Sequence, residues 1–324
     1  MSSRDYVRFI CCMGAFLFLG TALANVSIDP QDVFRLGLVQ HHANPNTRFR
    51  RMAQYLENRT SIDGLAFASS RGGALDASLL ARKMGVERVL NITIPYGLMT
   101  DHLPFLEFIV ADKQSRGEHL SSVFLLLDAD LFGTVPWTDH NIDAYLPPPI
   151  ASRSRFWWRY LTAFQWRNWK KDLFLNFQAK HVSTAPVLAG WSPLNLKLAA
   201  VGRTDPQLVK FAESIDAPDL RRQLLLLTSF IALCQRHNIA LTLALSPIST
   251  RNPVPPMRVK QMADAIASLH PLTDFSGPNP LSSDPRSWTD ASHFTAEVGA
   301  SVIDSSFDIT PTFGVKRTPP TQGK

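Results

Sequence analysis

Two short segments of the chain are apolar at nearly every position rather than at alternate positions: SVFLLL at residues 122–127 and IALTLAL at residues 239–245. Successive side chains of a β-strand point to opposite faces, so a strand of this kind must be covered on both sides. Such strands are typical of parallel sheets with helices on both faces. This feature restricts the fold more than any other in the chain.

Further apolar segments and the stretches between them complete this pattern. Residues 64–68, which are apolar and short, and residues 89–94, a β-branched segment, are predicted as strands. Because strands and helical stretches alternate with short connections, the predicted fold class is α/β, a three-layer α/β/α domain with a parallel sheet. Ligands of such sheets bind at the carboxyl ends of the strands. Helices are expected at 45–59, 75–85, 98–117, 207–237, 256–269 and from about residue 295.

The N-terminus carries an apolar segment ahead of this domain. Arg4 and Arg8 precede the apolar residues 9–24, which is the layout of a secretory signal peptide or of a single signal anchor at residues 1–25. We favour the uncleaved anchor. The positive charge before the segment predicts that the rest of the chain lies outside the cytoplasm.

Composition excludes several other classes of protein. Of 324 residues, 45% are hydrophobic and 19% are charged, so a large core is available and global disorder is excluded. A net charge of +6 is too small to indicate a nucleic-acid partner. Cys234 is the one cysteine of the body, which rules out a disulfide framework there. No cofactor-binding loop or metal motif is present, and we expect neither a cofactor nor a metal.

The α/β pattern breaks at about residues 147–205, which we interpret as a helical insertion. A basic, Trp-rich helix is typical of a membrane interface with anionic lipids, so residues 153–171 are a candidate second membrane contact. The same composition also fits a helix packed on its own domain, or a polymer-binding surface. The other expected divisions are a linker and leading helix at 26–60, the α/β domain at 61–310 and a flexible tail at 311–324. The Trp, Arg and Lys residues of 153–171 are Arg153, Arg155, Trp157, Trp158, Arg159, Trp166, Arg167, Trp169, Lys170 and Lys171.

Two short motifs at the ends of the domain carry candidate catalytic residues. FASSRGG, residues 67–73, follows the first predicted strand, and DASHF, residues 290–294, lies near the C-terminus. A serine hydroxyl needs a histidine base, which a carboxylate orients. From the residues alone either serine of the first motif is a candidate nucleophile. Each group also has a structural interpretation, such as a helix N-cap for Ser70.

Together these motifs resemble the SGNH (GDSL-type) hydrolase superfamily, and most closely its membrane-anchored, extracytoplasmic branch. Proteins of teichoic-acid D-alanylation and exopolysaccharide O-acetylation are similar. The resemblance implies a flavodoxin-like SGNH fold on the periplasmic side of the bacterial inner membrane. It implies that Ser70 is the nucleophile, with Asp290 and His293 as acid and base. It places the oxyanion hole at the N–H groups of Ser70 and of Gly97 in LNITIPYG, with Asn91 as a substitute donor because the family's Gly-x-Asn-Asp block is absent.

The resemblance implies a serine esterase or O-acyltransferase that acts on an ester or an acylated cell-envelope carbohydrate. The missing block leaves an alternative, a catalytically inactive, membrane-anchored envelope assembly or binding factor. Arg71 is expected to pair with Asp128 or Asp130, or to bind an anionic group of the substrate. Expected partners are the membrane and an envelope carbohydrate or acyl donor, without nucleic acid.

Overall fold

The chain forms two compact units. The first comprises Met1–Gln54 and Thr138–Leu188, and the second comprises Tyr55–Trp137 and Ala189–Lys324. The structure, a computed structural model, describes residues 2–36, 38–40, 42, 45–132, 146–179, 217–252 and 254–319.

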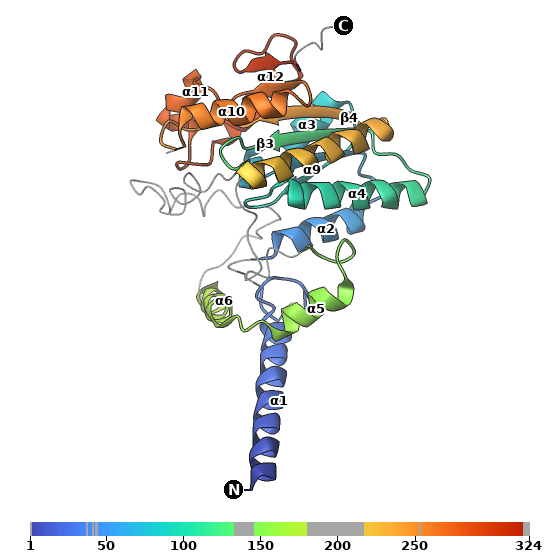
Figure 1. The fold of residues 1–324 in the computed structure, drawn as a ribbon, viewed down its shortest axis with the longest axis vertical. Coiled ribbons are helices and arrows are strands. Elements are labelled where there is room, and N and C mark those ends of the chain that lie inside the picture. Colours follow the sequence, from blue (N-terminus) through green and yellow to red (C-terminus); the bar gives the residue numbers. More distant parts are fainter. Residues whose placement is uncertain are drawn as a thin grey trace. The chain divides into compact units, whose positions relative to one another are not determined.

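The second unit is built on a six-stranded sheet with the order β2-β1-β3-β4-β5-β6 (Figure 1). The first five strands of the chain run parallel, and β6 runs antiparallel to β5. The predicted α/β class is therefore confirmed, and the sheet, predicted to be parallel, is mixed because β6 is antiparallel. The strands are β1 (Gly64–Ala68), β2 (Val89–Thr93), β3 (Ser122–Leu127), β4 (Ala240–Leu245), β5 (Leu272–Asp274) and β6 (Val315–Arg317).

Strand β1 has a special place in this sheet because it lies between β2 and β3. Gly64 pairs with both Val89 and Ser122, so the three strands begin and end at about the same level. The chain passes outwards from β1 to β2 and then returns across β1 to β3. The strand order thus reverses beside β1, and the loops that leave such a point diverge and leave room for a ligand. FASSRGG is the loop at this position.

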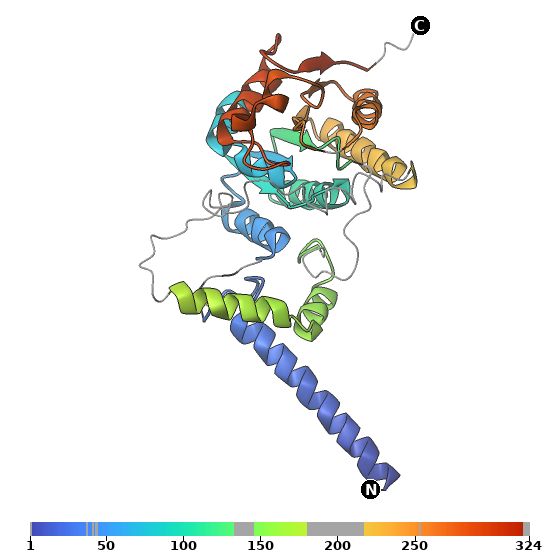
Figure 2. The same cartoon turned by 90° about the vertical axis from the view of Figure 1, so that its left-hand side faces the viewer.

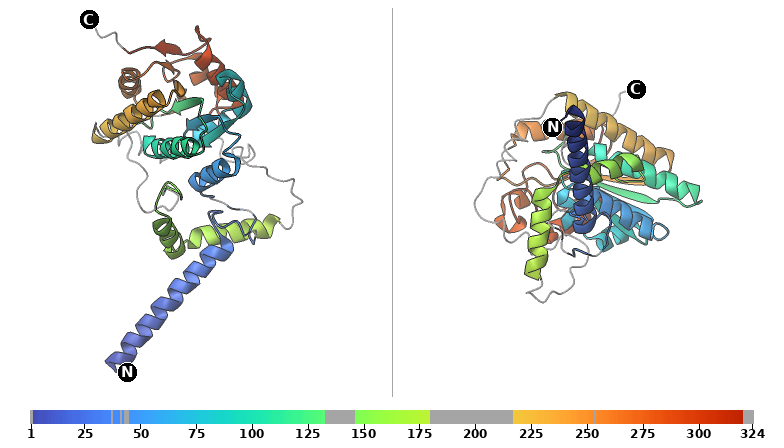
Figure 3. Two further views of the ribbon diagram at one scale, coloured as in Figure 1. Left: turned by 90° about the vertical axis from the view of Figure 1, so that its right-hand side faces the viewer. Right: turned by 90° about the horizontal axis from the view of Figure 1, so that it is seen from below.

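The strands and helices of this unit follow the sequence pattern, except that β4, expected to be covered on both sides, is buried only in its second half, at Leu243–Leu245. Every residue of β1 and β3 is buried, as their continuous apolar sequence predicts. Helix α4 packs against α9, and α3 packs against α12 (Figures 1 and 3). Residues 207–216 of one expected helix lie outside the described residues. The helices and 3₁₀ turns of this unit are η1 (Ser70–Ala74), α3 (Ala77–Met84), α4 (Met99–Ser115), α9 (Ala217–Arg236), α10 (Pro256–Ala267), α11 (Pro280–Ser283), η3 (Pro285–Ser287) and α12 (Ala296–Phe307). Helix α2 (Thr47–Asn58) includes residues of both units, which divide between Gln54 and Tyr55.

The first unit contains the N-terminal apolar segment as one helix, α1 (Ser3–Ile28). Helices α5 (Arg153–Thr162) and α6 (Trp166–Ala179) pack against it near its C-terminal end (Figure 2). At 1.5 Å per residue α1 is about 39 Å long, and a bilayer has a hydrocarbon core of about 30 Å. Among the described residues α1 is the helix that is long and apolar enough to cross a membrane, a test that a signal sequence also passes.

Two of the expected divisions differ from the observed ones. The described part of the insertion, residues 146–179, clusters with α1 in the first unit, and residues 180–205 lie outside the described residues. The tail expected to be flexible contains β6, in which Arg317 Nε lies 2.6 Å from Asp274 Oδ2. Pairing with a neighbouring strand orders a segment whose Pro- and Thr-rich sequence has no strand pattern of its own.

Candidate active site

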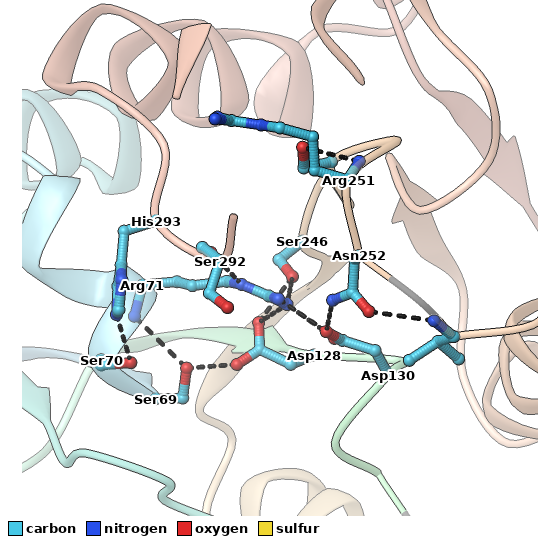
Figure 4. A network of polar contacts seen from close by, with 12 residues as sticks. Ser69, Ser70, Arg71, Asp128, Asp130, Ser246, Arg251, Asn252, Ser292 and His293 are labelled. Atoms are coloured by element: carbon cyan, nitrogen blue, oxygen red, sulfur yellow. Dashed lines mark hydrogen bonds and ion pairs between the residues drawn. The ribbon is translucent and has the colours of Figure 1, made fainter. Parts of the chain in front are cut away.

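Three residues predicted as a catalytic triad lie in hydrogen-bond contact at the carboxyl end of β1 (Figure 4 shows Ser70 and His293). Ser70 Oγ lies 2.9 Å from His293 Nε2. The other ring nitrogen of His293, Nδ1, lies 2.7 Å from Asp290 Oδ2. The hydroxyl thus faces one nitrogen of the imidazole and the carboxylate faces the other, which is the order that base-assisted nucleophilic attack requires.

The DASHF loop is held rigidly at both ends. Trp288 and Phe294 form an isolated antiparallel β-bridge, and both side chains are buried in the core of the second unit. Within the loop, Asp290 Oδ1 accepts hydrogen bonds from the N–H groups of Ser292 at 2.7 Å and His293 at 2.8 Å. The carboxylate therefore shapes the loop with one oxygen and orients the imidazole with the other.

These contacts also affect the ionisation of Asp290. Its partial burial favours the neutral acid, but the hydrogen bond and charge of His293 and the two backbone N–H groups favour the carboxylate more strongly. The pKa of Asp290 therefore lies below its ordinary value. A carboxylate that stays ionised is suited to orienting an imidazole and to stabilising an imidazolium beside it.

The serine turn follows β1 directly, and Ser69 rather than Ser70 caps it. Ser69 Oγ accepts from the N–H of Arg71 at 3.3 Å, which leaves the Ser70 hydroxyl for His293. Gly72 is required inside the turn, because a Cβ there would lie 2.5 Å from Ala68 Cβ and 2.6 Å from Thr93 Oγ1. The N-cap interpretation therefore applies to the first serine of the motif and not to the second.

Arg71 lies beside His293 and connects the site to the residues that follow β3 and β4 (Figure 4). Its guanidinium donates to both oxygens of Asp130, at 2.6 Å each, and its Nη1 lies 3.0 Å from Asp128 Oδ1. Its Nε donates to the carbonyl of Ser292, beside His293, at 2.8 Å. The side chain is 4% exposed. Arg71 therefore pairs with both expected carboxylates, and its buried, occupied guanidinium does not face a substrate, which corrects the alternative of anion binding.

Two buried carboxylates share this one guanidinium, so other donors complete the network. Asp128 accepts from the hydroxyls of Ser69 and Ser246, the latter at 2.5 Å. Asn252 Nδ2 donates to Asp130 Oδ2 at 2.7 Å. Asp128 is likewise buried, so the structure supports its expected place behind the triad and not one in contact with substrate. Buried charges persist only when they are paired and hydrogen-bonded, and these neutral donors offset the second negative charge.

Charge pairing in this network shifts the pKa values of its members. Burial alone would lower the pKa of Arg71, but the charges of Asp128 and Asp130 outweigh it and raise the pKa above its ordinary value. Burial would raise the pKa of Asp130, but Arg71 and the amide of Asn252 lower it below its ordinary value. Arg71 and Asp130 therefore both stay charged at neutral pH.

Two of the expected oxyanion donors serve other acceptors. The N–H of Gly97 donates to the carbonyl of Ile94 at 2.8 Å, because the chain turns back after β2 and this bond closes the turn. The amide of Asn91 donates to the carbonyl of Gly72 at 2.8 Å and so supports the serine turn. Of the three expected donors, the N–H of Ser70 is the one without an acceptor in the described part of the chain.

The network contains residues that the sequence alone did not single out. Ser246 follows β4 directly, and Asn252 lies six positions further along the same connection. Ser246 carried the same signal as the serine pair, a polar residue at the end of a continuous apolar strand. Asn252 carried no signal, because its role depends on how the connection folds back over β3.

No family model and no curated protein sequence matches this chain. In the described residues no group of three or more His, Cys, Asp and Glu side chains lies in a metal-binding arrangement. What the site can do chemically therefore follows from its residues. They comprise a hydroxyl in contact with an imidazole, an ionised carboxylate behind the imidazole, and one backbone N–H beside the hydroxyl.

Proposed function

We propose that the protein is an SGNH-like serine esterase or O-acyltransferase that acts on an ester or an acylated carbohydrate of the cell envelope. The observation that carries the proposal is the contact of Ser70 with His293, together with that of His293 with Asp290. Each group alone has a structural interpretation, but an arrangement that joins residues 223 positions apart in the order nucleophile, base, carboxylate has no structural explanation as simple.

In the first step Ser70 Oγ attacks the carbonyl carbon of the ester and gives its proton to His293 Nε2. The N–H of Ser70 donates to the oxyanion. As the tetrahedral intermediate collapses, the C–O bond to the alcohol breaks, and the alcohol leaves with the proton from His293. The acyl group then remains on Ser70.

In the second step water or a carbohydrate hydroxyl gives a proton to His293 and attacks the acyl carbon. The bond to Ser70 Oγ breaks, and the serine recovers its proton from the imidazolium. Asp290 keeps the imidazole oriented throughout and stabilises its charged form. Water as the acceptor makes the protein an esterase, and a sugar hydroxyl makes it an O-acyltransferase.

The fold and the anchor support a place in the cell envelope. The strand order and the buried strands are compatible with the three-layer, flavodoxin-like SGNH fold that the motifs suggest. Arg4 and Arg8 precede the apolar part of α1, which under the positive-inside rule puts the second unit on the periplasmic side of the bacterial inner membrane.

One observation favours a second candidate function, that of an inactive envelope assembly or binding factor. With the N–H of Gly97 and the amide of Asn91 bonded elsewhere, one expected oxyanion donor remains, and each lost donor lowers the rate by roughly 10²–10³-fold. An inactive relative would keep the fold and bind its partner through the basic, Trp-rich segment at residues 153–171. A folded protein that never carries an acyl group, yet co-purifies with another envelope protein, has this function.

The test is labelling of the full chain in detergent with a fluorophosphonate probe, followed by mass spectrometry of the peptides. The proposal predicts an adduct on Ser70 that is lost in Ser70→Ala and His293→Ala. Ser78→Ala is the matched control, because Ser78 is an exposed serine on α3 that touches no triad residue, and its variant is expected to label normally. Folded wild-type protein without an adduct would overturn the catalytic proposal in favour of the second candidate.

A further inference from the structure

Helices α5 and α6 carry large apolar side chains that the first unit leaves exposed. Exposed groups of this size, gathered on neighbouring elements, mark an interaction site. Their number on two short helices is too large for the scattered apolar residues of an ordinary protein surface. We call them the α5–α6 apolar surface, which consists of Trp158 of α5, Phe164 of the connection between the helices, and Trp166, Leu173, Phe174 and Phe177 of α6.

On α6 the exposed apolar residues other than Leu175 lie on one face. Trp166, Leu173 and Phe177 are seven and eleven positions apart, a spacing that puts them on the same side of a helix. The other side is buried within the first unit through Trp169 and Asp172. Helix α6 therefore has one face that packs inside the first unit and a separate apolar face that is exposed.

Basic residues accompany this apolar face. Lys170 lies within the exposed face, and Arg167 and Lys171 lie beside it, all three exposed. Helices that lie in the plane of a membrane interface combine an apolar face with lysine and arginine, whose long side chains extend from within the face or from its edge to anionic lipid head groups.

Contact with α1 determines where the α5–α6 apolar surface lies relative to a membrane that α1 crosses. The ring of Trp158 lies 5.6 Å from the ring of Phe18, centroid to centroid. Phe18 belongs to the apolar part of α1 and lies about 15 Å along the helix axis from Ile28, at 1.5 Å per residue. A membrane that α1 crosses therefore reaches Trp158, and tryptophan is the residue that favours the membrane–water interface.

Asn25 holds α5 and α6 at this level. Its side chain is fully buried, and Nδ2 donates to the carbonyls of Tyr160 at 2.8 Å and Ala163 at 2.9 Å. Its Oδ1 accepts from Trp169 Nε1 at 2.9 Å. The connection between α5 and α6 is therefore fixed to the end of α1, and the apolar surface cannot turn away from the membrane without breaking these bonds.

We infer that the α5–α6 apolar surface inserts into the interface of the bilayer that α1 crosses, with Arg167, Lys170 and Lys171 at anionic lipid head groups. The occupant of the surface is lipid rather than another protein, because the surface is continuous with the spanning helix and carries the charge that anionic lipid attracts. The inference does not depend on catalysis at Ser70, and its failure would leave the proposed function untouched.

The test places a nitroxide label at Trp166→Cys or Phe177→Cys in the full chain, after Cys11, Cys12 and Cys234 have been replaced by Ala. The protein is reconstituted into vesicles of phosphatidylethanolamine and phosphatidylglycerol. Collisions of the label with oxygen, which concentrates in lipid, are compared with collisions with a water-soluble nickel chelate. Labels at Leu225 and Ile309 are controls, because these apolar residues of the second unit are at least as exposed, at 67% and 93% against 60% for Trp166.

The inference predicts a higher oxygen-to-nickel ratio at Trp166 and Phe177 than at both control positions. Nickel access equal to that of the controls would overturn it. Labels protected from both reagents would also overturn it, because a second copy of the chain would then cover the surface. The variant Lys170→Glu/Lys171→Glu is expected to lower the ratio at Phe177. An unchanged ratio there would overturn the assignment of anionic head groups.

Discussion

His293 Nε2 lies 2.9 Å from Ser70 Oγ, although 223 positions separate the two residues in the chain. Three features produce this contact. The serine turn is closed through Gly72, the DASHF loop is held by the bridge between Trp288 and Phe294, and α12, which follows that loop, packs against η1. The contact is thus a consequence of packing between elements, and variants that alter each feature test it.

Replacement of Asp290 by Asn tests the role of the carboxylate. The amide cannot stabilise an imidazolium and favours the wrong tautomer of His293, so we expect the rate of acylation at Ser70 to fall on the order of 10⁴-fold. The measurement is the rate of fluorophosphonate labelling of folded variant and wild type. A labelling rate that stays near that of the wild type would show that the carboxylate only shapes the loop.

The same variant has a predicted dependence of stability on pH. Because the pKa of Asp290 in the folded chain lies below its ordinary value of 3.8, the carboxylate stabilises the folded state fully above that pH. This stabilisation is lost as pH falls through the lower, folded-state pKa. The difference in free energy of unfolding between wild type and Asp290→Asn, measured by urea denaturation, should therefore shrink below about pH 4. A difference that grows in acid would contradict the assignment.

Arg71→Met tests the buried charge network. The variant leaves Asp128 and Asp130 without their cation, and breaking a buried pair in this way costs about 3–5 kcal/mol of stability. The change in the free energy of unfolding is measured by urea denaturation. Arg71→Lys is expected to cost less, because a lysine restores the charge but not the paired hydrogen bonds to Asp130.

The control for Arg71 is a double-mutant cycle with Asp130→Asn. Removing one of the two uncompensated charges should recover part of the stability lost in Arg71→Met, so the double variant should be more stable than the sum of the single effects predicts. Strictly additive effects would mean that the two side chains do not interact energetically.

Gly299→Ala tests the packing of α12 on the serine turn. A Cβ at Gly299 would lie 2.0 Å from the carbonyl oxygen of Ala74, so α12 has to move away from η1. We expect a loss of stability of about 1–3 kcal/mol, typical of overpacking, and slower labelling of Ser70 because His293 moves with α12. Gly73→Ala is the matched control, since a Cβ there meets nothing within 4 Å, and it should leave both quantities near those of the wild type.

Asn25→Asp tests how the first unit is held together. The aspartate keeps the size and one acceptor of asparagine but replaces the donor that faces the carbonyls of Tyr160 and Ala163 with a second acceptor. A buried group left unsatisfied costs about 1–3 kcal/mol, and more if it is charged. We expect limited proteolysis in detergent to cut the α5–α6 connection faster in the variant. Equal cleavage rates would show that the hydrogen bonds of Asn25 do not hold the connection in place.

Much of the fold was predictable because its signals are local. The strand at 64–68 has the predicted bounds, and the apolar segment at 122–127 is buried along its whole length. The ends of α3 follow from Asp76, which accepts from two N–H groups of its first turn, and from Gly85, at φ +66°. These signals depend on neighbours in the chain. Strand β6 depends on pairing with β5, and the sequence did not reveal it.

The candidate site was predictable in its residue types and not in its hydrogen bonds. Ser70, Asp290 and His293 stand out because strand ends and a DxxH spacing are visible in the chain. The direction of the Gly97 N–H and the partner of the Asn91 amide depend on how two turns close against each other, and both expectations for an oxyanion donor were wrong in this structure.

The sequence by itself determined which residues could carry chemistry and which segments must be buried, because composition and periodicity are properties of the chain alone. Only the tertiary structure decided which of them meet. Tertiary packing brings Ser70 into contact with His293 and pairs Arg71 with two carboxylates. It also binds the described part of the insertion to α1 through Asn25. A contact between residues far apart in the chain forms only when packing has brought their elements together, and no local pattern specifies that distance.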